Sequence, residues 1–128
     1  MKLEKIHHVA IICADYEKSK RFYTKILGFE VISEIYREEQ QSFKLDLAVG
    51  DSFQIELFSF PDVPARASYP EAAGLRHLAF AVKDIAAFVN NLTSQGVDVE
   101  KVRVDPLTKK RFTFFSDPDG LPIELYEE

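Results

Sequence analysis

Hydrophobic and polar residues alternate along several short stretches of the chain, and a period of two is typical of strands with one buried face. In the first half this pattern predicts strands over residues 5–12, 29–36, 42–49 and 52–60. A helical spacing of apolar residues separates the first two strands, with Asp15 as its N-cap and Gly28 at its end. The first half therefore reads as β-α-β-β-β, with a hairpin turn at Gly50-Asp51.

The same order returns in the second half of the chain. Strands are predicted over 75–82, 97–104, 111–116 and 121–126, and a helix runs from Asp84 to Gly96. His77 and Asp84 each follow a first-half counterpart, His8 and Asp15, by 69 residues. This offset indicates an internal duplication. We expect one α+β domain over residues 1–128, with modules at about 1–60 and 75–128 and a proline-containing linker over 61–74.

Composition narrows the class of protein. The chain has 128 residues, a net charge of −5 and 46% hydrophobic residues, which indicates a soluble globular domain rather than a nucleic-acid binder. It has one cysteine, Cys13, which we expect to be structural, and it has no apolar run of about 18 residues. The N-terminus lacks a signal-peptide layout, so we expect a cytoplasmic protein without membrane contact.

Four residues carry candidate chemistry because each lies in a strand that otherwise looks like core. They are His8, Glu56, His77 and Glu124, and alternation places each on the face opposite the most apolar positions. An ionised carboxylate there needs a partner, and two imidazoles with two carboxylates are suitable ligands for divalent Zn, Ni, Co, Mn or Fe. Alternation points His7 away from its neighbour, so we do not expect it to share the metal.

The motifs HHVAIICADYEKSKRFYTKILGF, QIELF, GLRHLAFAV and FSDPDGLPIELYE resemble the vicinal oxygen chelate, or glyoxalase I-like, superfamily and within it the small YaeR-type proteins. The resemblance implies two paired βαβββ modules that form a curved eight-stranded sheet around a metal cup. It implies that His8, Glu56, His77 and Glu124 are the ligands, with Zn or Ni favoured. A homodimer is also implied.

The resemblance further implies lyase chemistry on a small oxygenated substrate. Glyoxalase I converts a hemithioacetal of methylglyoxal and glutathione to a thioester through a metal-stabilised enediolate. Glu124 is the first choice for the base that moves the proton, and Glu56 is the second.

Two positions depart from the glyoxalase I pattern. The arginine and the asparagine that hold glutathione are replaced here by Ile12 and Phe60. We therefore expect poor activity with the glutathione adduct. Arg111 is the better candidate for an anion contact, while Lys109 and Lys110 read as a solvated loop. Further candidate substrate contacts are Phe58, Phe60 and Tyr126.

Other functions stay open at this point. An extradiol-type dioxygenase uses two histidines and one carboxylate on Fe(II), and the fourth ligand argues against it. A thioester epimerase and a fosfomycin-type thiol transferase fit Glu56 less well. A non-catalytic module that binds a metal or another ligand is the alternative outside enzymology.

Overall fold

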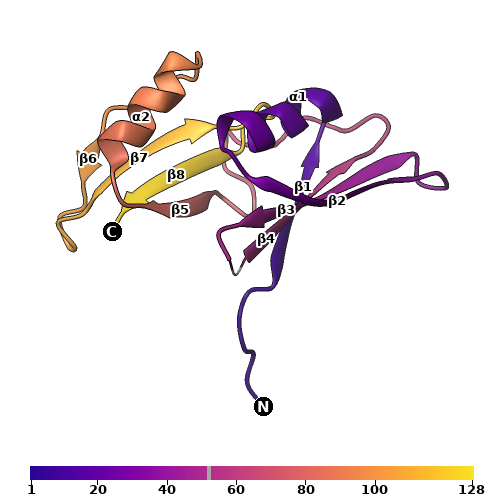
Figure 1. The fold of residues 1–128 in the computed structure, drawn as a ribbon, viewed down its shortest axis with the longest axis horizontal. Helices are drawn as coiled ribbons and strands as arrows, with labels where there is room; N and C mark the ends of the chain where they lie inside the picture. Colours follow the sequence, from indigo (N-terminus) through magenta and orange to yellow (C-terminus); the bar gives the residue numbers. More distant parts are fainter. Residues whose placement is uncertain (52) are drawn as a thin grey trace. The chain divides into compact units, whose positions relative to one another are not determined.

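The computed structural model describes residues 1–51 and 53–128 and divides the chain into two compact units, Met1–Ala65 and Arg66–Glu128. The division falls inside the predicted linker. Each unit has the element order strand, helix and three further strands, as the duplicated pattern predicts (Figure 1). The chain is therefore an α+β protein built from two modules of the same kind.

The first unit contains a four-stranded sheet and one helix. Its elements are β1 (His8–Cys13), α1 (Tyr16–Arg21), a π-helical turn η1 (Phe22–Ile26), β2 (Glu30–Arg37), β3 (Ser42–Val49) and β4 (Phe53–Ser59). The strand order is β1-β4-β3-β2, in which β1 and β4 are parallel and the other neighbours are antiparallel. The two strands predicted to carry His8 and Glu56 are thus direct neighbours.

The second unit repeats this arrangement. Its elements are β5 (Leu78–Val82), α2 (Ile85–Ser94), β6 (Arg103–Val104), β7 (Arg111–Ser116) and β8 (Pro122–Glu127). The strand order is β5-β8-β7-β6, and the outer strand β5 again runs parallel to the last strand, β8. The topology of the two sheets is therefore the same.

Both helices begin where the sequence predicts. The Asp15 side chain accepts a hydrogen bond from the Lys18 amide at 3.1 Å, and Asp84 accepts one from the Ala87 amide at 3.0 Å. Each bond satisfies one of the amides that a helix start leaves without a partner. Gly96 follows α2 with a φ of 82°, a left-handed conformation that glycine adopts without strain. These local signals confirm the predicted helix positions.

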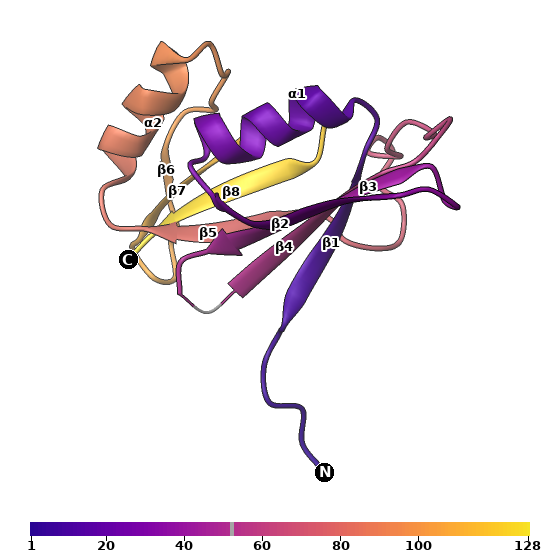
Figure 2. The ribbon, with the colours of Figure 1, turned by 45° about the vertical axis from the view of Figure 1, so that its right-hand side comes forward.

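Each sheet buries one face under its helix (Figure 2). In β4, Ile55 and Leu57 are buried, and in β8, Ile123 and Leu125 are buried. The alternate residues of both strands are only half-buried. The core side of each sheet is thus the apolar face that alternation predicts, and the polar candidates lie on the other face.

Three predicted strands differ from the structure in length. β1 begins at His8 rather than residue 5, β5 begins at Leu78 rather than residue 75, and β6 has 2 residues instead of the range 97–104. Before β6, the Glu100 carbonyl accepts a hydrogen bond from the Thr113 hydroxyl at 2.7 Å, and the Glu100 amide donates to the Phe114 carbonyl at 3.0 Å. The predicted first residue of β4, Ser52, lies outside the described residues. In the part of the chain that the structure describes, no helix is long and apolar enough to cross a membrane.

Candidate metal centre

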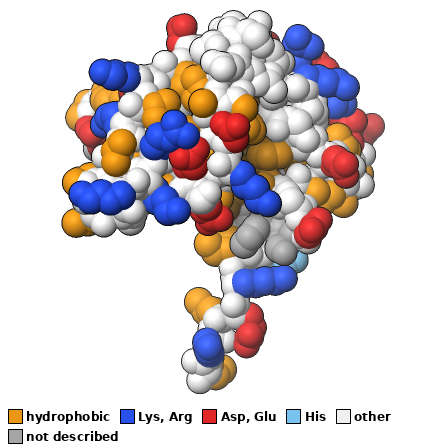
Figure 3. All heavy atoms as spheres, turned by 60° about the vertical axis from the view of Figure 1, so that its left-hand side comes forward, with side chains coloured by type: hydrophobic (Ala, Val, Ile, Leu, Met, Phe, Trp, Pro, Cys, Tyr) orange, Lys and Arg blue, Asp and Glu red, His pale blue; other side chains and the backbone are white. Residues whose placement is uncertain are grey.

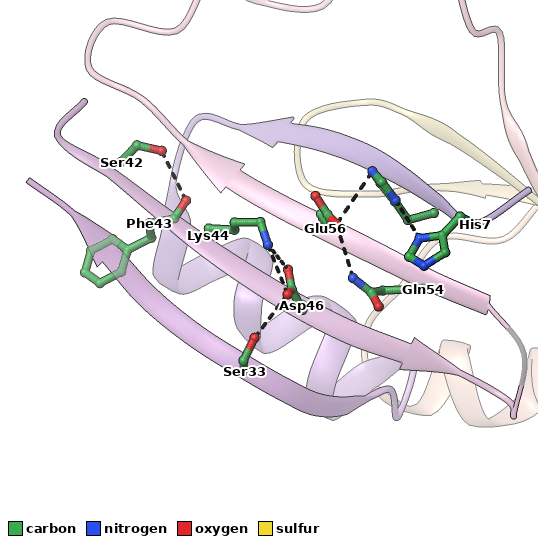
Figure 4. A network of polar contacts seen from close by, with 9 residues as sticks. His7, Ser33, Ser42, Phe43, Lys44, Asp46, Gln54 and Glu56 are labelled. Atoms are coloured by element: carbon green, nitrogen blue, oxygen red, sulfur yellow. Dashed lines mark hydrogen bonds and ion pairs between the residues drawn. The ribbon is translucent and has the colours of Figure 1, made fainter. Parts of the chain in front are cut away.

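A histidine and a glutamate lie side by side in the first unit. His8 opens β1, and Glu56 of β4 is in register with Ala10, two residues after His8. The distance from His8 Nε2 to Glu56 Oε2 is 3.6 Å, and Gln54 Nε2 donates a hydrogen bond to the same oxygen at 3.2 Å. Figure 4 shows Glu56 and Gln54 on the face of the sheet that α1 does not cover. The carboxylate is 12% exposed and the imidazole 42%, so both donor atoms can meet a ligand.

The second unit holds an equivalent pair. Glu124 of β8 is in register with Ala79, which again lies two residues after the histidine, His77. His77 Nε2 lies 3.2 Å from Glu124 Oε1. The Phe114 ring and the imidazole meet edge to face, with 5.1 Å between ring centroids. The aromatic contact helps to fix the orientation of His77.

The spacing within each pair is close to that of two ligands of one ion. Donor atoms that each lie about 2.1 Å from a metal, at angles of about 90–110°, are separated by about 3.0–3.4 Å. The separation in the second pair, 3.2 Å, lies within this range, and that in the first pair, 3.6 Å, lies slightly above it. Imidazole nitrogen with carboxylate oxygen is also the donor set that divalent transition metals accept. The residues present therefore fit a divalent ion.

The structure brings the four predicted ligands together as two pairs, one pair in each unit. Taken by itself over the described residues, neither unit gathers three or more His, Cys, Asp or Glu side chains in an arrangement that could hold a metal ion. That all four residues bind one ion thus stays a prediction.

The neighbours of the two pairs differ in chemistry. Beside Glu56, in register on β3, lies Asp46, which accepts hydrogen bonds from Lys44 at 2.9 Å and from Ser33 at 3.0 Å (Figure 4). The residue in register with Glu124 on β7 is Phe114, and Phe112 lies two positions before it. The face is therefore polar around the first pair and aromatic around the second.

His7 does not point away from His8, which corrects the prediction from alternation. The two Nδ1 atoms lie 2.9 Å apart, and the rings meet edge to face. The reason is that β1 begins only at His8, so His7 precedes the strand and its side chain does not follow the pleat.

Arg111 is also placed differently from the prediction. Its Nε and Nη2 atoms each donate to Glu127 at 2.8 Å, and Glu127 in turn accepts the Ile85 amide at the start of α2. The hydrogen bonds from Arg111 hold the pKa of Glu127 below its usual value. In β7, Arg111 alternates with the buried Thr113 rather than with Phe112, so it lies on the helix side of the sheet. It is therefore not on the face that carries Glu124.

Phe58, Phe60 and Tyr126 stay candidates for substrate contact. The Phe58 and Phe60 rings stack with 6.1 Å between their centroids, and Ile12 is in register with Phe58. Ile12 and Phe60, the two departures from the glyoxalase I pattern, therefore both lie next to Phe58. Tyr126, two residues after Glu124, donates its hydroxyl to Asp105 at 3.1 Å and contacts Thr108.

One residue on this face was not predicted. The guanidinium carbon of Arg37 lies 4.9 Å from the centroid of the Phe58 ring. The alternation of β2 indicates which residues share a face with Arg37. Placing that face beside Phe58 also requires the register between β2 and β3, which the sequence does not supply.

The surface carries charged side chains of both signs. On the side of the molecule that Figure 3 shows, Lys and Arg side chains are interspersed with Asp and Glu. With a net charge of −5, this pattern differs from the basic face of a typical nucleic-acid binder.

The chain was compared with known proteins. The family model of the Glyoxalase/Bleomycin resistance protein/Dioxygenase superfamily matches residues 5–125. The uncharacterized protein YwkD of Bacillus subtilis is 62% identical over the full length of both chains, and the uncharacterized protein YaeR of Escherichia coli is 60% identical over 98% of each. A glyoxalase family protein from Enterococcus faecalis has a solved structure with a TM-score of 0.91, 51% identity and coverage of 99% of this chain and 100% of its own.

More distant relatives have names that refer to function. A probable lactoylglutathione lyase of Vibrio cholerae is 28% identical over 99% of this chain and 93% of its own length. The solved structure of TnmS3, an antibiotic binding protein from Streptomyces sp. CB03234, is 27% identical with a TM-score of 0.78 and covers 99% and 98% of the two chains. An enzyme and a binding protein thus occur at similar distances from this chain.

Proposed function

This chain belongs to the Glyoxalase/Bleomycin resistance protein/Dioxygenase superfamily, and on that premise we propose that it is a divalent-metal-dependent lyase of the glyoxalase type. Its substrate is a small molecule with two adjacent oxygen functions. The observation that carries the proposal is the repeated His–Glu pair, present at the same register position in both sheets.

The proposed ligands of the ion are His8, Glu56, His77 and Glu124. Support comes from the donor set and from the 3.2 Å and 3.6 Å separations, which are within or close to the range for adjacent ligands. When bound, the ion would supply Lewis acidity that polarises the two substrate oxygens and makes the neighbouring C–H more acidic. Zn²⁺ and Ni²⁺ are the first candidates, and a homodimer with one ion per chain is the proposed assembly.

Glu124 is the proposed general base. Glu56 receives a hydrogen bond from Gln54, whereas Pro122 occupies the corresponding place two residues before Glu124 and has no donor. Among the described residues, the only polar contact of the Glu124 side chain is the one with His77. Its carboxylate is therefore the less restrained of the two, and it can take a proton from one substrate carbon and return it to the neighbouring carbon.

The thiol part of the substrate is proposed to differ from glutathione. Ile12 is 54% exposed and lies in register with Phe58, and Phe60 stacks on the same ring. Apolar side chains at these two places cannot form the charged hydrogen bonds that glutathione carboxylates need, each of which contributes about 1.5–3 kcal/mol. Phe58, Phe60 and Tyr126 are the proposed contacts for the substrate body.

Metal loading followed by a turnover assay tests the proposal. Purified protein is loaded separately with Ni²⁺, Zn²⁺, Co²⁺ and Mn²⁺, and bound metal and conversion of the methylglyoxal–glutathione hemithioacetal are measured. We expect one metal per chain and slow conversion at best, with faster proton exchange on other enolisable thiol adducts. Failure to bind any of these metals would refute the metal-dependent function, and turnover as fast as that of an authentic glyoxalase I would refute the argument from Ile12 and Phe60.

A second candidate function is a ligand-binding module without catalysis. The structural likeness to an antibiotic binding protein, at 27% identity, favours it. Glu56→Ala and His77→Ala distinguish the two functions. An enzyme loses metal and activity together in both variants, whereas a metal-independent binder keeps its affinity for the ligand.

A further inference from the structure

Arg37 lies on the same face of the first sheet as the His8–Glu56 pair. It is the last residue of β2 and is in register with Ser42 of β3. Ser42, Lys44 and Asp46 alternate along one face of β3, and Asp46 is in register with Glu56. The register therefore extends one continuous surface from the candidate metal ligands to Arg37.

The guanidinium of Arg37 is held in place by two aromatic rings and one hydroxyl. Its central carbon lies 4.9 Å from the centroid of Phe58 and 5.7 Å from that of Phe60. Nη2 donates to Ser42 Oγ at 2.8 Å. A cation fixed over stacked rings loses little further freedom when it binds an anion.

The positive charge of Arg37 has no counter-ion. None of the carboxylates in the described part of the chain lies within 4.0 Å of its nitrogens, whereas Arg103 and Arg111 each pair with a glutamate. Its Nε is buried without an acceptor. Its Nη1 also has no acceptor among the described residues and is absent from the buried groups, so it is accessible. Partial burial of an unpaired cation is unfavourable, and an anion at Nη1 and Nη2 would offset that cost.

We propose that Arg37 is a binding site for the carboxylate of the substrate. The inference rests on the proposed function for the other end of that molecule. Glu56 and Phe58 are two residues apart, or about 7 Å along the strand, which puts the guanidinium on the order of 10 Å from the candidate ligands. The substrate class is thus a small acid with two adjacent oxygens at one end, a carboxylate about 10 Å away, and an apolar segment that passes Phe58.

The first test uses metal-free protein and glutarate, so it does not depend on the metal site. Because Nε of Arg37 is buried, its N–H exchanges slowly and gives an NMR signal that Arg37→Lys removes. We expect glutarate to shift this signal saturably, and the same shift to occur in Arg21→Met, a control that removes an exposed helix arginine. A signal that does not respond to glutarate would overturn the proposal.

The second test measures the carboxylate in the presence of metal. Suberic monohydroxamic acid carries a metal-binding hydroxamate at one end and a carboxylate at the other, and its methyl ester is the neutral control. We expect metal-loaded wild type and Arg21→Met to bind the acid about 10- to 100-fold more tightly than the ester, and Arg37→Met to bind both equally. Equal binding by wild type would overturn the proposal. If the protein binds no metal but glutarate shifts the Arg37 signal, the proposed function fails and the anion site stands.

Discussion

Replacing Glu56 by glutamine separates metal binding from the stability of the fold. Among the described residues, the carboxylate has two polar contacts, a hydrogen bond from Gln54 and the His8 ring at 3.6 Å, and Lys44 pairs with Asp46 instead. Glutamine keeps an oxygen that can accept the Gln54 hydrogen bond and loses only the charge. We therefore expect the free energy of unfolding of metal-free Glu56→Gln to lie within about 1 kcal/mol of the wild-type value.

The metal-loaded proteins should differ much more. A free metal concentration of 100 times Kd stabilises a one-site protein by about 2.7 kcal/mol. A chain of 128 residues has an unfolding entropy of roughly 0.27 kcal/mol/K, so the wild-type Tm should rise by about 10 °C. If Glu56→Gln lowers the affinity by about 100-fold, the same metal concentration stabilises it by about 0.4 kcal/mol, or roughly 1–2 °C.

Scanning calorimetry of Glu56→Gln and Leu57→Ala, each with and without metal, checks this reasoning. Leu57 is the next residue of β4, points to the helix side and is fully buried. Its truncation should cost about 3 kcal/mol and lower Tm by roughly 10 °C, yet the rise in Tm on metal addition should remain. The assignment of Glu56 as a ligand is refuted if Glu56→Gln keeps the full metal-induced rise. A loss of more than about 2 kcal/mol in the metal-free variant would instead assign Glu56 a structural role.

Two further outcomes are expected. His8→Ala and His77→Ala should each reduce bound metal to a similar extent in equilibrium dialysis, because the two histidines occupy the same register position; an effect of only one substitution would contradict this. Hydrogen bonds from Lys20 and Tyr16 lower the pKa of Glu34, so its contribution to stability is complete above about pH 4.5 and is lost as the pH falls through the lower folded-state pKa. Urea unfolding at acid pH should show a weaker pH dependence for Glu34→Gln, and an unchanged pH dependence would show that this carboxylate does not stabilise the fold.

Much of the fold could be predicted because its signals are local. Alternation along β4 and β8 identifies the buried face from a few consecutive residues, and Asp15 and Asp84 each cap a helix through an amide three residues ahead. Because the chain is duplicated, the β-α-β-β-β pattern is predicted twice, from two separate segments of the sequence. These signals need no knowledge of which strands pair.

The residues whose positions were predicted wrongly or missed have positions that depend on strand starts and strand pairing. The face on which Arg111 lies depends on where β7 begins its alternation and on its register with β8, and a shift of one residue would have moved it to the face that carries Glu124. The direction of the His7 side chain depends on where β1 begins. Arg37 reaches Phe58 across two strand pairings, which no spacing in the sequence reveals.

The two sheets retain the His–Glu pairs but differ at the positions around them. Asp46 of the first sheet and Phe114 of the second occupy equivalent places, since each is in register with the glutamate of its own sheet. A duplicated module that served only as scaffold would have no reason to keep one imidazole and one carboxylate on its less buried face, where their removal costs little stability. The proposed metal site would account for the retained pairs, because a divalent ion needs several ligands of this kind. We propose that the changed positions hold the substrate, since a molecule with two adjacent oxygens at one end and a carboxylate at the other requires different contacts along its length. On the first sheet that task falls to Arg37 and Phe58, which is why the carboxylate test on Arg37 probes recognition rather than catalysis.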